Sequence, residues 1–249
     1  MSDRLILVTN DDGIFAPGIE TLASSASKFG KVVVVAPDRN RSAISSAMSV
    51  HSILRIDEIA QDRYACDGTP VDCILMGVRH VLEKTPDWIL SGVNWGFNLA
   101  EDVLYSGTVG AALEGRLQGF RSAAFSLERN GNLEVAGGWI EKFLLAWETI
   151  DLPQGSIWNV NMPEGELKGF RITTQGRRDY YDLMEKRLDP RGKPYFWIGG
   201  EGGPDYEMAE GTDTAVVHDG YVSLTPININ LTCRETIARR KEYEGAFGI

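Results

Sequence analysis

The chain has 249 residues, 43% of them hydrophobic, with 25 basic and 35 acidic side chains and a net charge of −10. This length suits one sizeable domain or two modest ones. The acidic balance argues against a nucleic-acid partner, because phosphate backbones require a basic surface. No apolar run approaches the ~18 residues of a membrane span, and no secretory signal precedes the first apolar run. The cysteines, Cys66, Cys73 and Cys233, show no metal-type spacing, so we expect free thiols in a cytoplasmic protein.

The first apolar run, Leu5–Val8, is followed by Thr9 and the turn Asn10-Asp11-Asp12-Gly13. The run predicts a buried central strand of a parallel sheet. The two carboxylates then lie at its carboxyl end, where open α/β sheets bind ligands. At about 4 Å and an effective dielectric near 20, two such charges repel by roughly 4 kcal/mol. A divalent cation would offset this repulsion; alternatively, the acids only form the turn and cap the next helix.

Strand and helix signals alternate through the following 160 residues or so. Pro17 suits the first position of a helix and Gly30 the residue past its end. Thr69, Pro70 and Asp72 form a near capping box, which predicts a helix to about Leu82; alternatively, this segment only starts that helix. The other predicted strands are Val32–Ala36, Ser52–Ile56, Arg63–Cys66, Trp88–Leu90, Ala123–Leu127, Ile157–Val160 and Phe170–Thr173, and Leu133–Trp147 is a predicted helix.

The pattern changes after Gln175, where the chain becomes polar and rich in turns. Tyr195–Ile198 predicts a short aromatic strand, Val222–Pro226 a returning strand and Thr232–Tyr243 a terminal helix. We therefore predict an α/β catalytic core over residues 1–174. Residues 175–249 would form a β excursion, the returning strand and the C-terminal helix, without being an independent domain. The exposed aromatics of the excursion suit an interface between subunits.

Polar side chains follow three of the predicted strands at one edge of the sheet. They are Asn10-Asp11-Asp12, Asn40-Arg41-Ser42, and the pair Asn94 and Asn98. Carboxylate, hydroxyl and amide oxygens are hard ligands, which suit Mg²⁺, Mn²⁺ or Ca²⁺. The histidines, His51, His80 and His218, are far apart in sequence, and we expect them to be structural or on the surface.

Ser106-Gly107-Thr108 stands before a predicted helix and offers backbone N–H groups to an anion, although it could equally be an ordinary N-cap. The chain has no P-loop and no Gly-x-Gly-x-x-Gly after the first strand. A haloacid-dehalogenase-like phosphatase needs an aspartate nucleophile where this chain has Asn10. The sequence therefore favours direct attack by metal-activated water over a covalent intermediate.

Five ordered motifs together resemble the SurE family, the survival-protein 5′/3′-nucleotidases. They are Val8–Gly13, Ala36–Ser42, Gly68–Cys73, Ser91–Asn94 and Tyr105–Val109, and the later segments Tyr195–Gly200 and Gly220–Pro226 also resemble the family. The resemblance covers nearly the whole chain. It implies a Rossmann-like three-layer sandwich with a mostly parallel sheet, and a metal-dependent phosphomonoesterase that hydrolyses nucleoside 5′- and 3′-monophosphates.

The resemblance also implies roles for individual residues and an oligomeric assembly. One divalent cation per subunit, Mg²⁺ or Mn²⁺ with Ca²⁺ possible in crystals, would be held by Asp11, Asp12, Ser42 and Asn94. Asn40, Asn98, Ser106, Gly107 and Thr108 would lie against the phosphate. Family members are dimers or tetramers, with the β excursion and terminal helix packed between subunits.

Several alternatives stay open at the level of sequence. Asp11 is the better candidate for the base or water-orienting role, but sequence does not separate it from Asp12. A non-catalytic nucleotide-binding module on the same fold is the rival function, and cleavage of short polyphosphates is a possible side activity. Ala43, Trp95 and Phe97 depart from the commoner family pattern, which affects substrate preference more than chemistry.

Overall fold

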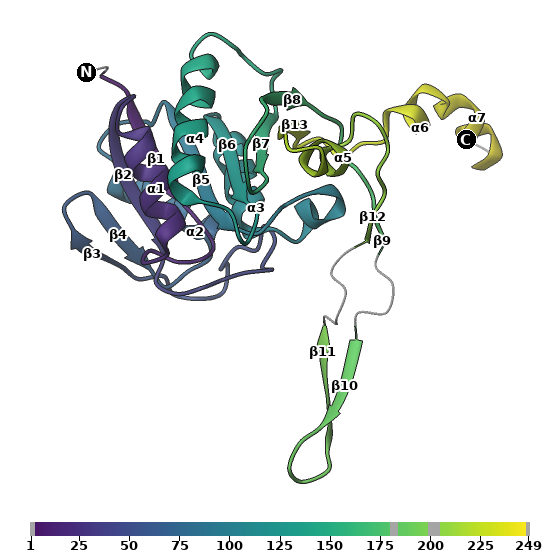
Figure 1. Cartoon of the computed structure of the whole chain (residues 1–249), viewed down its shortest axis with the longest axis horizontal. Helices are drawn as coiled ribbons and strands as arrows, with labels where there is room; N and C mark the ends of the chain where they lie inside the picture. Colours follow the sequence, from purple (N-terminus) through teal and green to yellow (C-terminus); the bar gives the residue numbers. More distant parts are fainter. Residues whose placement is uncertain (1–2, 180–183, 199–204, 248–249) are drawn as a thin grey trace.

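The computed structural model describes residues 3–179, 184–198 and 205–247. Within these residues, nine strands form the main sheet in the order β3-β4-β2-β1-β5-β6-β7-β13-β8 (Figure 1). The strands are β1 (Leu5–Thr9), β2 (Lys31–Pro37), β3 (Ile56–Ala60), β4 (Arg63–Cys66), β5 (Trp88–Trp95), β6 (Arg121–Leu127), β7 (Ser156–Met162), β8 (Phe170–Ile172) and β13 (Val222–Asn228).

The sheet is parallel from β4 to β7, with β1 near its centre between β2 and β5. The chain passes from β1 to β2 on one side and later returns to β5 on the other. This change of direction is the topological switch point of an open α/β sheet, where ligands bind. At the edges, β3 is antiparallel to β4, and β13 is antiparallel to β7. The prediction of a mostly parallel sheet is confirmed.

Helices cover both faces of the sheet and make three layers. The helices are α1 (Pro17–Ala26), α2 (Pro70–Met76), α3 (Gly107–Leu117), α4 (Leu133–Trp147), α5 (Asp213–His218), α6 (Arg234–Ala238) and α7 (Arg240–Phe247). Ile6 and Val8 pack in one core cluster with α1 and α4, whereas Leu5 and Leu7 pack in a second cluster with α2. Because successive side chains of a strand point to opposite faces, both faces of β1 are buried, which explains its unbroken apolar run.

Local signals in the sequence begin several of these helices. Pro17 is the first residue of α1. The Thr69 side chain accepts the backbone N–H of Asp72, and the Asp72 carboxylate accepts that of Thr69. This reciprocal pair is the predicted capping box, and the helix continues through a π turn, Gly77–Val81, to Leu82. None of the helices in the described part of the chain is long and apolar enough to cross a membrane.

Several predicted boundaries differ from the structure. Strand β3 is Ile56–Ala60, so the predicted strand Ser52–Ile56 overlaps it only at Ile56, and β5 extends to Trp95 instead of ending at Leu90. Helix α3 begins at Gly107, inside the segment predicted to precede it. Gly30 follows the end of α1 by several residues. It is required there because a Cβ atom would lie 2.4 Å from the Arg4 carbonyl oxygen. Helix α5 was not predicted, and the terminal helix is divided into α6 and α7 at Arg239.

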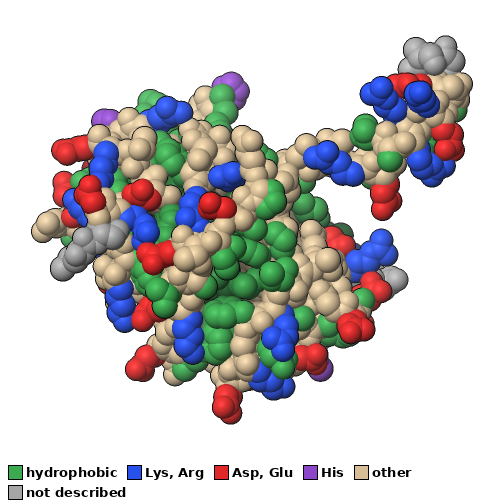
Figure 2. Space-filling model, turned by 90° about the horizontal axis from the view of Figure 1, so that it is seen from above, with side chains coloured by type: hydrophobic (Ala, Val, Ile, Leu, Met, Phe, Trp, Pro, Cys, Tyr) green, Lys and Arg blue, Asp and Glu red, His purple; other side chains and the backbone are tan. Residues whose placement is uncertain are grey.

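Two segments extend away from the globular body (Figure 1). The predicted aromatic strand is β11 (Pro194–Ile198), which pairs antiparallel with β10 (Met184–Leu188) in a hairpin. In sequence the hairpin lies between the two strands of a short antiparallel pair, β9 (Arg178–Asp179) and β12 (Asp205–Tyr206). Helices α6 and α7 contain no buried residue and form an arm that stands clear of the body in Figure 2. Gly199 and Gly200 of the quoted motif lie outside the described residues.

The close approach of α1 to β5 generates a stability prediction. A Cβ atom at Gly18 would lie 2.0 Å from the Val93 carbonyl oxygen, whereas Gly138 in α4 has open space around it. We expect Gly18→Ala to lower the free energy of unfolding by about 3 kcal/mol or more, because the helix must shift away from the sheet. Gly138→Ala should raise it by roughly 0.5–1 kcal/mol. Urea denaturation checks both, and equal effects of the two changes would contradict the packing described here.

Candidate active site

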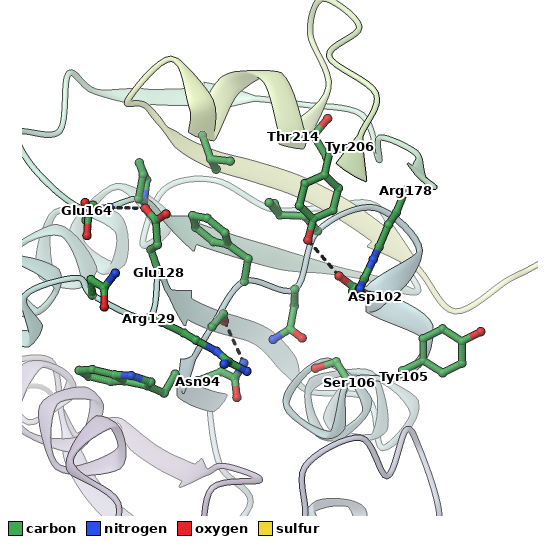
Figure 3. Close-up of a pocket in the computed structure, with 18 of the residues that line it drawn as sticks. Asn94, Asp102, Tyr105, Ser106, Glu128, Arg129, Glu164, Arg178, Tyr206 and Thr214 are labelled. Carbon is green, nitrogen blue, oxygen red and sulfur yellow. Dashed lines mark hydrogen bonds and ion pairs between the residues drawn. The ribbon is translucent and has the colours of Figure 1, made fainter. Parts of the chain in front are cut away.

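A pocket of about 1030 Å³ opens at the carboxyl ends of β1, β5 and β6 (Figure 3). Asp11, Asp12, Ser42 and Asn94 all line it, as do Asn98 and Ser106. These residues come from four separate parts of the chain, after β1, after β2, at the end of β5 and at the start of α3, which the topology brings to one edge of the sheet. The predicted grouping of polar strand-end residues therefore exists in the folded protein.

Asp11 is buried, with 3% of its surface exposed. The hydroxyl of Thr108 donates a hydrogen bond to its Oδ1 atom. Gly107 lies so close that a Cβ atom there would be 2.8 Å from the Asp11 Cβ and 3.0 Å from Oδ2. The start of α3 thus packs directly against this carboxylate, and only glycine permits that approach.

Burial raises the pKa of Asp11 to about 6. The Thr108 hydrogen bond lowers that pKa, and the charge of Asp12 raises it further. Burial also raises the pKa of Asp12, which the backbone N–H of Trp95 counteracts by donating to Oδ2 at 3.2 Å. Both carboxylates are therefore harder to ionise in the folded protein than in water, as expected for adjacent acids that are removed from solvent.

The loop after β2 carries Ser42 to the pocket. The Arg41 backbone N–H donates to the Asp11 carbonyl oxygen at 2.7 Å, and the Arg41 guanidinium donates to the Asp67 carbonyl oxygen at 2.5 Å. Asn40 donates to Asp12 Oδ1 at 3.4 Å and accepts the Ser42 backbone N–H at 2.8 Å. Asn40 is exposed and its contact is with Asp12, so it links the loop to the carboxylate pair.

Asn94 reaches the pocket because β5 is irregular where it passes β6. The register between the two strands shifts between Ser91 and Asn94. A Cβ atom at Gly92, whose φ is +129°, would lie 2.3 Å from the Phe125 carbonyl oxygen, so this position requires glycine. Such irregularities re-aim side chains next to active sites. The Asn94 amide nitrogen donates to the Gly96 carbonyl oxygen at 2.9 Å, which leaves its amide oxygen as the atom for a ligand.

Asn98 and Ser106 border the pocket beside α3. The Asn98 amide nitrogen donates to Ser126 at 2.8 Å, and its backbone accepts and donates hydrogen bonds with Asn161. Ser106 is the N-cap of α3 and accepts the Val109 backbone N–H at 3.1 Å. Gly107 and Thr108 are buried behind it, and neither is among the residues that line the pocket. Asn10 is also buried and holds the turn through Gly13.

The far side of the pocket contains residues that sequence reasoning missed. Arg178 pairs with Asp102, and the Tyr206 hydroxyl donates to the same carboxylate at 3.1 Å (Figure 3). Arg129 and His218 also line this part. Arg178 and Tyr206 come from the short strands β9 and β12, and the others come from a loop, a short 3-10 helix and the end of α5. These short elements have no periodic pattern, so no sequence signal placed them near the carboxylates.

The donor set suits a hard divalent cation. It comprises two carboxylates, a hydroxyl and an amide oxygen, all of which line the same pocket. The described residues contain no group of three or more His, Cys, Asp or Glu side chains placed to hold a metal. A cation here would therefore need the neutral oxygens of Ser42 and Asn94 beside the carboxylates, which is chemistry that Mg²⁺ and Mn²⁺ accept.

Comparison with known proteins agrees with this geometry. Residues 6–182 match the family described as "Survival protein SurE". The chain belongs to the SurE family. The "5′-nucleotidase SurE" of Syntrophotalea carbinolica is 45% identical over 232 residues, which are 92% of this chain and 92% of the relative.

Two further SurE proteins extend the comparison. The "5′/3′-nucleotidase SurE" of Yersinia enterocolitica is 44% identical over 231 residues, 91% of this chain and 92% of the relative. The crystal structure of the SurE protein from Aquifex aeolicus has a TM-score of 0.84 and 39% identity, and the match covers 96% of this chain and 99% of that one. The SurE fold therefore extends over both the core and the later segments.

The raised pKa of Asp11 predicts how pH changes stability without metal. The pKa of Asp11 in the folded protein, about 6, exceeds its ordinary value of 3.8. Asp11 therefore contributes most to the free energy of unfolding below pH 4, where it is protonated, and this contribution is lost as the pH rises through about 6. About two pKa units correspond to roughly 3 kcal/mol. In chelator-treated protein, Asp11→Asn should therefore stabilise the fold by up to that amount at pH 7 and little at pH 4.

Urea denaturation at the two pH values measures this effect, and Asp57→Asn on the exposed strand β3 is the matched control. A stability difference between wild type and Asp11→Asn that does not grow between pH 4 and pH 7 would contradict the burial argument.

Proposed function

We propose that this protein hydrolyses nucleoside 5′- and 3′-monophosphates to nucleoside and phosphate. The observation that carries the proposal is the adjacent pair of buried Asp11 and half-buried Asp12 at the switch point, in one pocket with Ser42 and Asn94. The names of the SurE relatives support the same activity.

In this proposal Asp11, Asp12, Ser42 and Asn94 hold one divalent cation, Mg²⁺ or Mn²⁺. When bound, such a cation polarises a phosphoryl oxygen and lowers the pKa of water. Asp11 is the better candidate to orient the attacking water, because Thr108 and the close approach of Gly107 fix its position. Asp12 accepts hydrogen bonds from Asn40 and from the Trp95 N–H, so its position depends on the loop after β2 and on the end of β5.

The phosphate would lie against the start of α3 and the residues beside it. Ser106 lines the pocket at the N-terminus of α3, which has 11 residues, where the helix dipole favours an anion. Asn98 lines the pocket beside it, and Asn40 approaches from the loop after β2. Gly107 and Thr108 would support this site from behind, since Thr108 is bonded to Asp11.

Release of inorganic phosphate from AMP, GMP and their 3′ isomers tests the proposal. We expect activity with Mn²⁺ or Mg²⁺ and none with a chelator. Asp12→Asn should lower kcat/KM by about 100-fold or more without loss of thermal stability, and Asp57→Asn should not change it. If the protein binds nucleotides but releases no phosphate with either metal, a non-catalytic binding module is the correct function instead.

Two variants of Thr108 distinguish a catalytic role of the Ser106-Gly107-Thr108 turn from a purely structural one. Thr108→Ala removes the hydrogen bond that fixes Asp11, and we expect kcat to fall by about tenfold or more, since a misplaced group costs rate directly. Thr108→Ser retains the hydroxyl and should keep most of the activity. If Thr108→Ala lowers the melting temperature yet has wild-type kcat/KM, the turn only starts the helix.

We also propose a cytoplasmic homodimer or homotetramer, in which residues 175–249 carry most of the subunit contacts. Phe196 and Trp197 are 57% and 59% exposed on the hairpin, and α6 and α7 have no buried residue. Burying these side chains against another subunit would remove them from water. Light scattering at micromolar concentration is expected to give two or four subunits; a monomer would refute the assembly.

A further inference from the structure

We propose that Arg129 binds the phosphoryl group of the substrate, beside Asn94. This inference rests on the proposed phosphatase function and adds a residue that the family motifs do not contain. Arg129 lies in the loop between β6 and α4, and its exposed side chain lines the pocket. The argument depends on where the side chain runs, on what it is paired with and on what a guanidinium recognises.

The Arg129 side chain passes beside Gly96. The Gly96 N–H donates to the carbonyl oxygen of Leu127, the last residue of β6, at 2.8 Å. A Cβ atom at Gly96 would lie 3.7 Å from Arg129 Nε and 3.8 Å from its Cγ, so the Arg129 side chain runs past the open side of this glycine. Asn94 donates to the carbonyl oxygen of the same glycine at 2.9 Å. Figure 3 shows the end of Arg129 directed toward Asn94.

The same stretch of backbone connects Arg129 to the carboxylate pair. Trp95, between Asn94 and Gly96, donates its N–H to Asp12 Oδ2 at 3.2 Å. Asp12 and Arg129 therefore approach one three-residue segment of chain, the carboxylate at Trp95 and the guanidinium at Gly96. A phosphoryl group held near Asp12 and Asn94 is within the reach of an arginine side chain placed there.

Within the described part of the chain, no side chain or carbonyl group pairs with the Arg129 guanidinium. The neighbouring carboxylate of Glu128 accepts the Glu164 backbone N–H at 2.8 Å, and Arg178 is paired with Asp102. Among the described residues, Arg129 has no ion pair and no hydrogen bond. An arginine presents its N–H donors in a planar fork that matches two phosphoryl oxygens, and such charge-assisted bonds are stronger than neutral ones. A dianionic phosphate in this pocket would supply the missing partner.

The competing assignment is that Arg129 contacts the nucleoside, by stacking on the base or by bonding to the ribose. Trp95, which is 43% exposed beside it, would favour such a role. The two assignments differ in one measurable way. A contact with the phosphoryl group is present in every phosphomonoester, whereas a contact with the nucleoside is absent from p-nitrophenyl phosphate.

The test compares Arg129→Gln, Arg129→Lys and wild type on AMP and on p-nitrophenyl phosphate with Mn²⁺. We expect Arg129→Gln to lower kcat/KM by about 10- to 100-fold on both substrates, since a hydrogen bond to a charged group is lost. Arg129→Lys should recover part of the loss, because it keeps the charge but not the fork. Arg79→Gln, in the π turn after α2, is the matched control: Arg79 is exposed and does not line the pocket, so its kcat/KM should be unchanged.

Binding gives a second readout that does not depend on turnover. Inorganic phosphate should raise the melting temperature of the wild-type protein with Mn²⁺, and this rise should be smaller in Arg129→Gln. If Arg129→Gln lowered kcat/KM only on AMP, the assignment to the phosphoryl group would be overturned. The same holds if this variant changed neither kcat/KM nor the binding of inorganic phosphate. A wild-type protein inactive on both substrates would instead refute the proposed function, and this inference with it.

Discussion

The burial of two adjacent carboxylates, Asp11 and Asp12, is the constraint on which the site depends. Asp11 is buried at the end of the central strand and Asp12, which follows it at once, is half-buried, so the fold removes water from both carboxylates. The protein offsets this only in part, with the Thr108 hydroxyl on one and the Trp95 N–H on the other. The raised pKa of both groups records the remaining cost, which comes first from burial and, for Asp11, also from the charge of Asp12. In the proposed function a divalent cation would remove this cost, and the oxygens of Ser42 and Asn94 would complete its ligands.

Close backbone approaches hold this arrangement in place. Gly107 lets α3 pack against Asp11, Gly92 lets β5 cross the end of β6, and Gly18 lets α1 reach Val93. In each case a Cβ atom would collide with the neighbouring chain. The carboxylates therefore sit on a rigid frame rather than on a free loop, which is what a site that positions a reacting phosphate requires. Loop residues such as Ser42 and Asn40 are then tied to that frame through Asp11 and Asp12.

The sequence predicted the core well where a single physical signal dominated. The run Leu5–Val8 identified the buried central strand, and the helix Leu133–Trp147 was confirmed to the residue because its apolar face and Asn132 cap agree. The grouping of Asp11, Asp12, Ser42 and Asn94 followed from their places after parallel strands and from the family resemblance. Their binding roles, and the division of the chain at residue 174, stay predictions.

Other features had no local signal to reveal them. The pairing of Arg178 with Asp102 joins residues 76 positions apart, and the approach of Arg129 to Gly96 depends on how β5 and β6 end. Gly30 was assigned to the end of a helix because glycine is common there, but its true constraint is the nearby Arg4 carbonyl oxygen. Such tertiary contacts are set by the packing of distant segments, which composition and periodicity do not encode.

Direct measurement of cation binding tests the central claim most sharply. Isothermal titration of Mn²⁺ into chelator-treated protein at pH 7 should give about one site per subunit. Because each carboxylate contributes a full ligand charge, the affinity should fall by about tenfold or more in Asp12→Asn and in Asp11→Asn, and should be unchanged in Asp57→Asn. Equal affinity in wild type and both site variants would contradict the account, since the carboxylate pair would then not be the cation site.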